Sequence, residues 1–114
     1  MARKISARTK RAVRGSHTGR PIMALLDLLG RRWTLRILWE LREQTLTSRA
    51  LRQACDDASP TVLQARLAEL REARLVERGP SSGYGLSELG RELLGPLLTL
   101  HHFAEHWSQT PPAE

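Results

Sequence analysis

The sequence predicts a mainly α-helical domain with one small β-hairpin. Apolar residues recur every three or four positions over most of residues 20–107, which is the period of an amphipathic helix. A glycine-rich turn, "GPSSG", separates two short stretches with strand character, "LVER" and "YGL". Serine or proline stands where several helical stretches begin, as helix starts prefer. A chain of 114 residues fits one small domain.

The positive charge is concentrated at the N-terminus. Residues 1–20 contain seven basic residues and no acidic one, whereas the rest of the chain has eleven bases and twelve acids, a net charge of −1. Residues 1–19 contain too little apolar surface to fold alone, so we expect a disordered N-terminal arm. Such an arm suits contact with a polyanion such as nucleic acid, and the alternative is a solubilising leader.

Several classes of protein are disfavoured. No apolar run approaches the length of a membrane span, and the basic N-terminus lacks the apolar centre of a signal peptide. We therefore expect no membrane partner and a cytoplasmic location, which agrees with a single cysteine, Cys55. No nucleophile stands beside a base, and no phosphate loop or metal motif is present, so we expect neither an enzyme nor a cofactor or metal ion.

Three helices are predicted before residue 56. The first begins at Pro21 and should stop at Gly30, and the second extends from Trp33 to Glu43. A short link follows, and Ser48 can cap the third, short helix.

A fourth helix and a hairpin come next. Ser59 can cap this helix, and Pro60 suits its first position, where a missing N–H costs nothing. The helix should extend to about Ala73, and the hairpin strands should lie at 75–78 and 84–86.

A long C-terminal helix should begin after Ser87, which can cap it, and Pro96 should kink or split it. A second copy of the chain is expected to cover part of its stripe, because one small domain cannot bury all of it. The residues of this near-heptad stripe are Leu93, Leu97, Leu100, Ala104 and Trp107. Residues 108–114 should form a flexible tail.

The order of these elements is that of a winged helix-turn-helix, in which two helices joined by a tight turn precede a β-hairpin. In this arrangement the second helix enters the DNA major groove, and the hairpin, or wing, lies along the flanking backbone or minor groove. The recognition helix would be residues 59–73 and the wing residues 75–86. We therefore expect a transcriptional regulator that binds specific sequences in double-stranded DNA.

The recognition helix has two different faces. Leu63, Leu67 and Leu70 share one side and should pack on the preceding helices. The other side presents small or polar groups without negative charge near the helix start. Gln64 can pair with adenine, and Thr61 can bond a base edge or contact a thymine methyl group.

Phosphate contacts are expected around this helix. The N–H groups at its start suit a phosphate. Arg49 and Arg52 on the short helix, and Arg78 at the hairpin, would hold further phosphates. Arg66 is a phosphate candidate too, but it could equally pair with Glu69 three residues on. The expected DNA-contacting residues are Arg49, Arg52, Ser59, Thr61, Gln64, Ala65, Arg66 and Arg78.

Five stretches of the chain carry a family resemblance: "RPI", "LDLLGRRWTLRIL", "SPTVLQARLAEL", "LVER" and "YGLSELGRELLGPLL". They resemble the HxlR-type winged-helix transcriptional regulators of the wider MarR-like group over about residues 20–107. The resemblance implies a homodimer with the first and last helices at its interface. Two recognition helices about one DNA turn apart would then favour a palindromic operator.

The chain departs from the family pattern at two places. Arg20 stands where the family often has a cysteine that some members use to sense oxidants, so that mechanism is not carried over. The hairpin is short, so its reach into the minor groove should be reduced, and the basic arm could compensate.

Some alternatives stay open. A winged-helix protein–protein interaction module that has lost specific DNA binding would agree with the near-neutral domain body. An unknown small-molecule effector at the dimer interface is also compatible with the sequence. Trp33, Trp39 and Trp107 are expected in the core rather than around such a cavity. Cys55 should be a packing residue whose thiol pKa is raised by its acidic neighbours.

Overall fold

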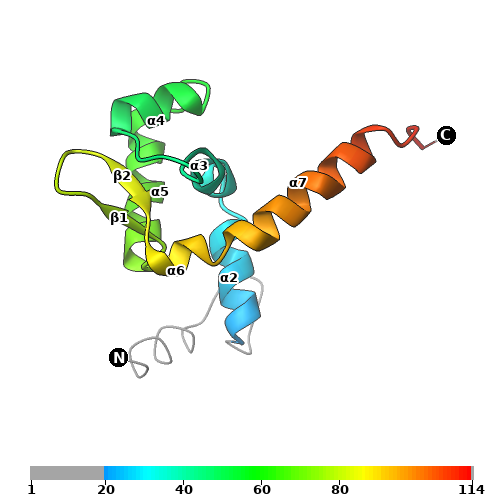
Figure 1. The fold of residues 1–114 in the computed structure, drawn as a ribbon, viewed down its shortest axis with the longest axis horizontal. Coiled ribbons are helices and arrows are strands. Elements are labelled where there is room, and N and C mark those ends of the chain that lie inside the picture. Colours follow the sequence, from blue (N-terminus) through cyan, green and yellow to red (C-terminus); the bar gives the residue numbers. More distant parts are fainter. Residues whose placement is uncertain (1–19, 114) are drawn as a thin grey trace.

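The computed structural model describes residues 20–113, so the basic arm predicted at residues 1–19 lies outside the described residues. The described part has the predicted order of elements, and Figure 1 labels them. They are α2 (Pro21–Leu29), α3 (Thr34–Glu40), α4 (Ser48–Ala54), α5 (Pro60–Glu72), β1 (Val76–Arg78), β2 (Tyr84–Leu86), α6 (Glu88–Arg91) and α7 (Leu94–Ser108). Within these residues no helix is both long and apolar enough to span a membrane.

The core lies where α3, α4, α5 and the hairpin meet. Helix α5 supplies three side chains, and their burial confirms the apolar face that helical spacing predicts. Helix α7 contributes one buried residue and otherwise projects away, so that the C-terminus and the hairpin lie at opposite ends of the molecule (Figure 1). The buried apolar residues are Ile37, Leu38, Leu41, Leu51, Cys55, Ala58, Leu63, Leu67, Leu70, Leu75, Val76, Tyr84, Leu86 and Leu97.

The wing is anchored to the chain that enters α4. Strands β1 and β2 pair antiparallel, with Arg78 opposite Tyr84. Leu46 then exchanges two backbone hydrogen bonds with Tyr84, of 2.9 and 2.7 Å. The sequence predicts only a link at this point. Gly85 accommodates the approach, because a Cβ atom there would lie 2.8 Å from Thr45 Cγ2.

Two helix boundaries differ from the sequence prediction. Trp33 adopts a left-handed backbone with φ 77° and stays outside α3, which ends at Glu40. The predicted helix of residues 33–43 was therefore too long at both ends. Thr47, not Ser48, caps α4, because its hydroxyl accepts a hydrogen bond from the Ala50 N–H at 3.1 Å.

The C-terminal helix starts and splits as predicted. The Ser87 hydroxyl accepts a hydrogen bond from the Gly90 N–H at 2.9 Å and caps α6. The chain breaks between α6 and α7 so that Pro96 falls in the first turn of α7, where a missing N–H is tolerated. Ser59 occupies the N-cap position of α5, but its side chain makes no capping hydrogen bond.

Substitution of Gly90 should destabilise the fold. A Cβ atom at this position would overlap the backbone carbonyl of Leu75, which cannot move without displacing the hairpin. We expect Gly90→Ala to lower the free energy of unfolding by about 1–3 kcal/mol or more, as overpacked sites do. Gly95→Ala is the matched control, because a Cβ atom there meets nothing within 4 Å. Equal denaturation midpoints for the two variants would contradict the close approach.

Candidate nucleic-acid interface

Helix α5 presents a free polar face. While Leu63, Leu67 and Leu70 are buried, Ser59, Thr61, Gln64 and Ala65 are all exposed. A helix fixed through one face, with short uncharged groups at the start of the other, suits insertion into the major groove.

The turn between α4 and α5 is held from α3. Asp56 and Asp57 both adopt left-handed backbone, with φ 56° and 59°. The Arg36 guanidinium donates hydrogen bonds to Asp56 Oδ2 at 3.2 Å and to the Ala54 carbonyl at 2.6 Å. It also reaches Glu40 Oε2 at 2.8 Å. One arginine on α3 therefore fixes the angle at which the chain enters α5, and no local sequence pattern signals this role.

The end of α5 is fixed just as firmly. Arg74 adopts φ 70°, a region that favours glycine, and the Leu75 N–H donates to the Leu70 carbonyl at 3.0 Å. This geometry reverses the chain into β1. The Ser87 hydroxyl donates to the Arg74 carbonyl at 2.6 Å while it caps α6. The recognition helix, the hairpin and α6 are thus joined at one corner.

The predicted phosphate-binding arginines differ in their surroundings. Arg49 and Arg52 are exposed on α4 and form no ion pair within the described residues. The Arg78 guanidinium lies 5.3 Å from the ring centroid of its cross-strand neighbour Tyr84. Arg66 forms the alternative ion pair that the sequence left open, at 2.6 and 2.8 Å from the carboxylate oxygens of Glu69.

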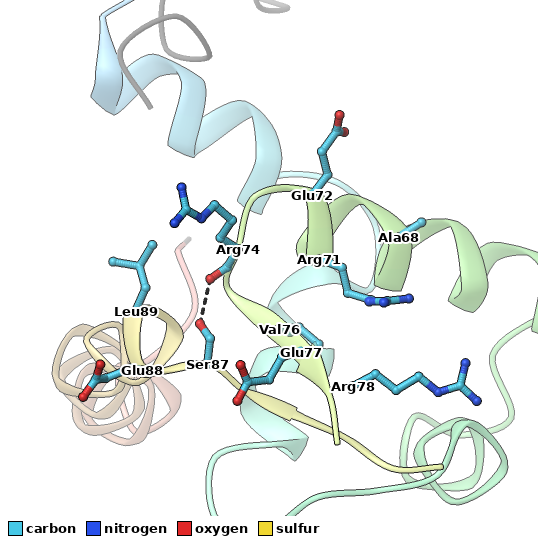
Figure 2. Close-up of a pocket in the computed structure, with 10 residues that line it drawn as sticks. All are labelled: Ala68, Arg71, Glu72, Arg74, Val76, Glu77, Arg78, Ser87, Glu88 and Leu89. Carbon is cyan, nitrogen blue, oxygen red and sulfur yellow. Dashed lines mark hydrogen bonds between the residues drawn. The ribbon is translucent and has the colours of Figure 1, made fainter. Parts of the chain in front are cut away.

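An open groove of about 980 Å³ separates the C-terminal half of α5 from the hairpin and α6. Arg71 and Arg74, which the sequence interpretation did not select, line it together with Arg78. In Figure 2 the side chains of Arg71 and Arg78 extend toward the same end of the groove, and that of Arg74 extends the other way. The groove also contains three glutamates, none of which pairs with these arginines. Basic side chains therefore continue from the recognition helix to the wing.

Large apolar side chains are exposed on α7 and α2, and none of them lines this groove. On α7, Leu100, Phe103 and Trp107 are 54%, 59% and 67% exposed, and on α2, Ile22 and Leu26 are 51% and 53% exposed. The expectation that Trp107 belongs to the core is therefore wrong, because α7 projects beyond it. Trp33 and Trp39 do pack against the core as half-buried side chains.

Cys55 is buried, and burial raises the pKa of its thiol. The positive charge of Arg36 acts in the opposite direction, whereas Glu40 and Asp56 add to the rise. The predicted direction is confirmed, although burial rather than the neighbouring acids is its main cause. Among the described residues no group of three or more potential metal ligands comes together.

The fold defines a class: a winged helix-turn-helix protein, in which α4 and α5 form the helix-turn-helix and the hairpin forms the wing. The model of the HxlR-like helix-turn-helix family matches residues 28–111, and the chain belongs to this family. The protein is therefore a DNA-binding transcriptional regulator and not an enzyme. The family resemblance and fold class predicted from the sequence are confirmed.

Known proteins agree with this assignment. The chain is 27% identical over 100 residues to the uncharacterized HTH-type transcriptional regulator sll1512 of Synechocystis sp.. The aligned region covers 82% of this chain and 74% of that protein. Quinone-bound YodB from B. subtilis is 26% identical with a TM-score of 0.69, covering 75% of this chain and 96% of YodB. A structure from Enterococcus faecalis, assigned to the MarR family, is 27% identical with a TM-score of 0.68, covering 87% and 96%.

Proposed function

We propose that this regulator binds a palindromic operator as a homodimer, with α5 in the major groove and the wing on the flanking backbone. The observation that supports this most directly is the free polar face of α5, whose opposite face is buried by three leucines. A helix that packs through one face only can insert the other into DNA without unfolding. A two-fold dimer would present two such helices to two half-sites.

Within this proposal, base reading falls to the first turns of α5. Gln64 would pair with adenine, Thr61 would bond a base edge, and Ala65 would allow close approach. Ser59 and the N–H groups that follow it would meet a phosphate. Arg49, Arg52 and Arg78 would hold the backbone, and their lack of carboxylate partners within the described residues supports this role. Arg66 would contact a phosphate less readily than these arginines, because its guanidinium is already paired with Glu69.

Exposed apolar side chains support the dimer. Leu100, Phe103 and Trp107 recur at three- and four-residue spacing on α7, and each is more than half exposed. Ile22 and Leu26 on α2 are further large apolar side chains that a monomer leaves in water. A second copy that packs its own α2 and α7 against them would remove their surface from solvent.

The remaining parts of the proposal concern the arm, the location and an effector. Residues 1–19 would act as a basic arm that contacts DNA, and the protein would be cytoplasmic and nucleoid-associated when bound. An effector has a suitable place in a hollow of about 370 Å³ between α3 and α7, lined by Leu35, Trp39 and Leu100 among others. The relative YodB is described with bound quinone, which supports a small-molecule effector in general terms.

A second candidate function is a winged-helix interaction module without specific DNA binding. The net charge of −1 beyond residue 20 favours it, because a DNA-binding body is usually basic. The two candidates make opposite predictions for a selection experiment.

Selection of full-length protein on a random duplex library at near-physiological salt should recover a palindrome. Its half-sites should lie about one helical turn apart, since the dimer sets the distance between recognition helices. Sequencing of the bound pool measures this directly. Binding without any enriched motif would favour the interaction module, with DNA held by the basic arm alone.

Gln64→Ala should relax the operator at one position in each half-site. A bidentate contact with adenine contributes about 1–3 kcal/mol of discrimination, so preference for that base should fall about tenfold or more. The affinity for random duplex should stay unchanged. Gln109→Ala is the control, since Gln109 is exposed beyond the end of α7. Unaltered base preference in the Gln64 variant would remove this residue from base reading.

Phe103→Glu should dissociate the dimer. It places a carboxylate in the exposed apolar surface that the second copy would bury, and desolvating an unpaired charge is costly. The molar mass from light scattering should fall toward that of one chain, and operator affinity should fall with it. His102→Glu adds the same charge about 100° away around α7 and should leave the mass unchanged. A Phe103 variant that keeps the mass of the dimer would exclude this interface.

A further inference from the structure

Glu69 lies between two arginines that come from different parts of the chain. Arg66, on the preceding turn of α5, places its Nη1 2.6 and 2.8 Å from the two carboxylate oxygens. Arg31, in the turn after α2, places its Nη1 3.2 Å from Oε2. The Nη2 of Arg31 also bonds Asp27 Oδ2 of α2 at 3.1 Å. The four side chains form a continuous network of ion pairs from α2 to the recognition helix.

This ion-pair network is partly shielded from water. The exposed fractions are 12% for Asp27, 31% for Arg31, 29% for Glu69 and 21% for Arg66. Burial alone would raise the pKa of the Glu69 carboxyl, but hydrogen bonds from Arg66 and Arg31 outweigh it and hold that pKa below its ordinary value. Glu69 is therefore ionised at neutral pH and binds both guanidinium groups.

The arginines have few other partners. The Nε atoms of Arg31 and Arg66 are buried without a hydrogen-bond partner, so each guanidinium is held through its terminal nitrogens. Loss of the Glu69 charge would leave Arg66 without its carboxylate and Arg31 with Asp27 alone. A network with so little redundancy depends on the one residue at its centre.

The position of Glu69 on α5 matters for DNA. Helix α5 packs most closely on α4 and β1, and α2 packs most closely on α3. The Arg31–Glu69 pair therefore joins α5 directly to the α2 end of the fold. At 100° per residue, Glu69 lies on the opposite edge of α5 from Arg71, which lines the groove beside the wing. The wing thus lies beside one edge of the recognition helix, and the ion-pair network lies beside the opposite edge.

We propose that Glu69 is a positioning residue, through which Arg31 and helix α2 set the orientation of the recognition helix in the major groove. The burial of leucines stabilises α5 but is non-directional, whereas an ion pair between two defined groups also restrains rotation about the helix axis. The inference rests on the proposed function, because α2 is also a helix that the second copy would cover. Glu69 would then align the two recognition helices with the dimer.

The test compares specific with non-specific binding. Glu69→Gln keeps the size of the side chain and removes its charge. We expect the ratio of operator affinity to random-duplex affinity to fall about tenfold, within the range of coupling energies for contacting residues. Affinity for random duplex should not change, because phosphate contacts need less exact alignment. If the ion pairs of Glu69 only stabilised the fold, their loss would lower the melting temperature. The ratio of operator affinity to random-duplex affinity would then stay unchanged in the folded protein.

The control for the lost charge is Glu43→Gln. Glu43 is exposed after the end of α3 and forms no ion pair within residues 20–113. Its substitution removes one negative charge without altering a contact of α5 or of the turn before it. The affinity ratio of the Glu43 variant should therefore equal that of the wild type.

Arg31→Gln tests the same link from the other side and leaves the Arg66–Glu69 pair intact, which guards against misfolding of the Glu69 variant. Its affinity ratio should also fall, and the double variant should be no worse than Glu69→Gln alone, because both act through one contact. Wild-type ratios in both single variants would overturn the inference but not the proposed function. A wild-type protein without a preferred sequence would overturn both.

Discussion

The burial of one face of α5 is the constraint on which the rest of the structure depends. Leu63, Leu67 and Leu70 hold the helix on the core, and that leaves the other face in solvent. A helix that binds in a DNA groove must be exposed along its length and also rigid, although a domain this small has few other elements to pack against it. Contacts at the two ends of α5 supply the missing rigidity. Arg36 fixes the turn before the helix, and Arg74 with Ser87 fixes the turn after it.

The arginines divide between two tasks, although their local sequences look alike. One group is paired with carboxylates and joins separate elements, namely Arg31, Arg36 and Arg66. The other group forms no ion pair within residues 20–113 and lies along α4, the end of α5 and the wing, namely Arg49, Arg52, Arg71, Arg74 and Arg78. Paired guanidinium groups have their charge compensated, while the unpaired ones remain available to phosphates. A net charge near zero therefore conceals several unpaired cations on α4, at the end of α5 and on the wing.

Local patterns in the sequence predicted what is local in the structure. Three-and-four spacing located α5 and its buried leucines, and a proline located the break before α7. The bridge between Leu46 and Tyr84 has no such signal, because a single pair has no period. Ion pairs such as Arg31–Glu69 join residues far apart in the chain, so only the folded arrangement reveals them. Trp107 shows a different limit: helical spacing predicted the apolar stripe of α7, but not which of its residues this chain buries itself.

Affinity and specificity can therefore have different sources in this protein. In the proposed complex, phosphate contacts from the basic arm would hold any DNA sequence and would lose strength as salt rises. Base contacts from α5 would select a sequence only when the helix has one orientation, since hydrogen bonds to base edges tolerate little displacement. The domain body, with a net charge of −1, gives little general attraction to DNA. Such a body would favour sequence specificity over general affinity for DNA. Once salt screens the charges of the arm, the body would add little to the binding of random sequences.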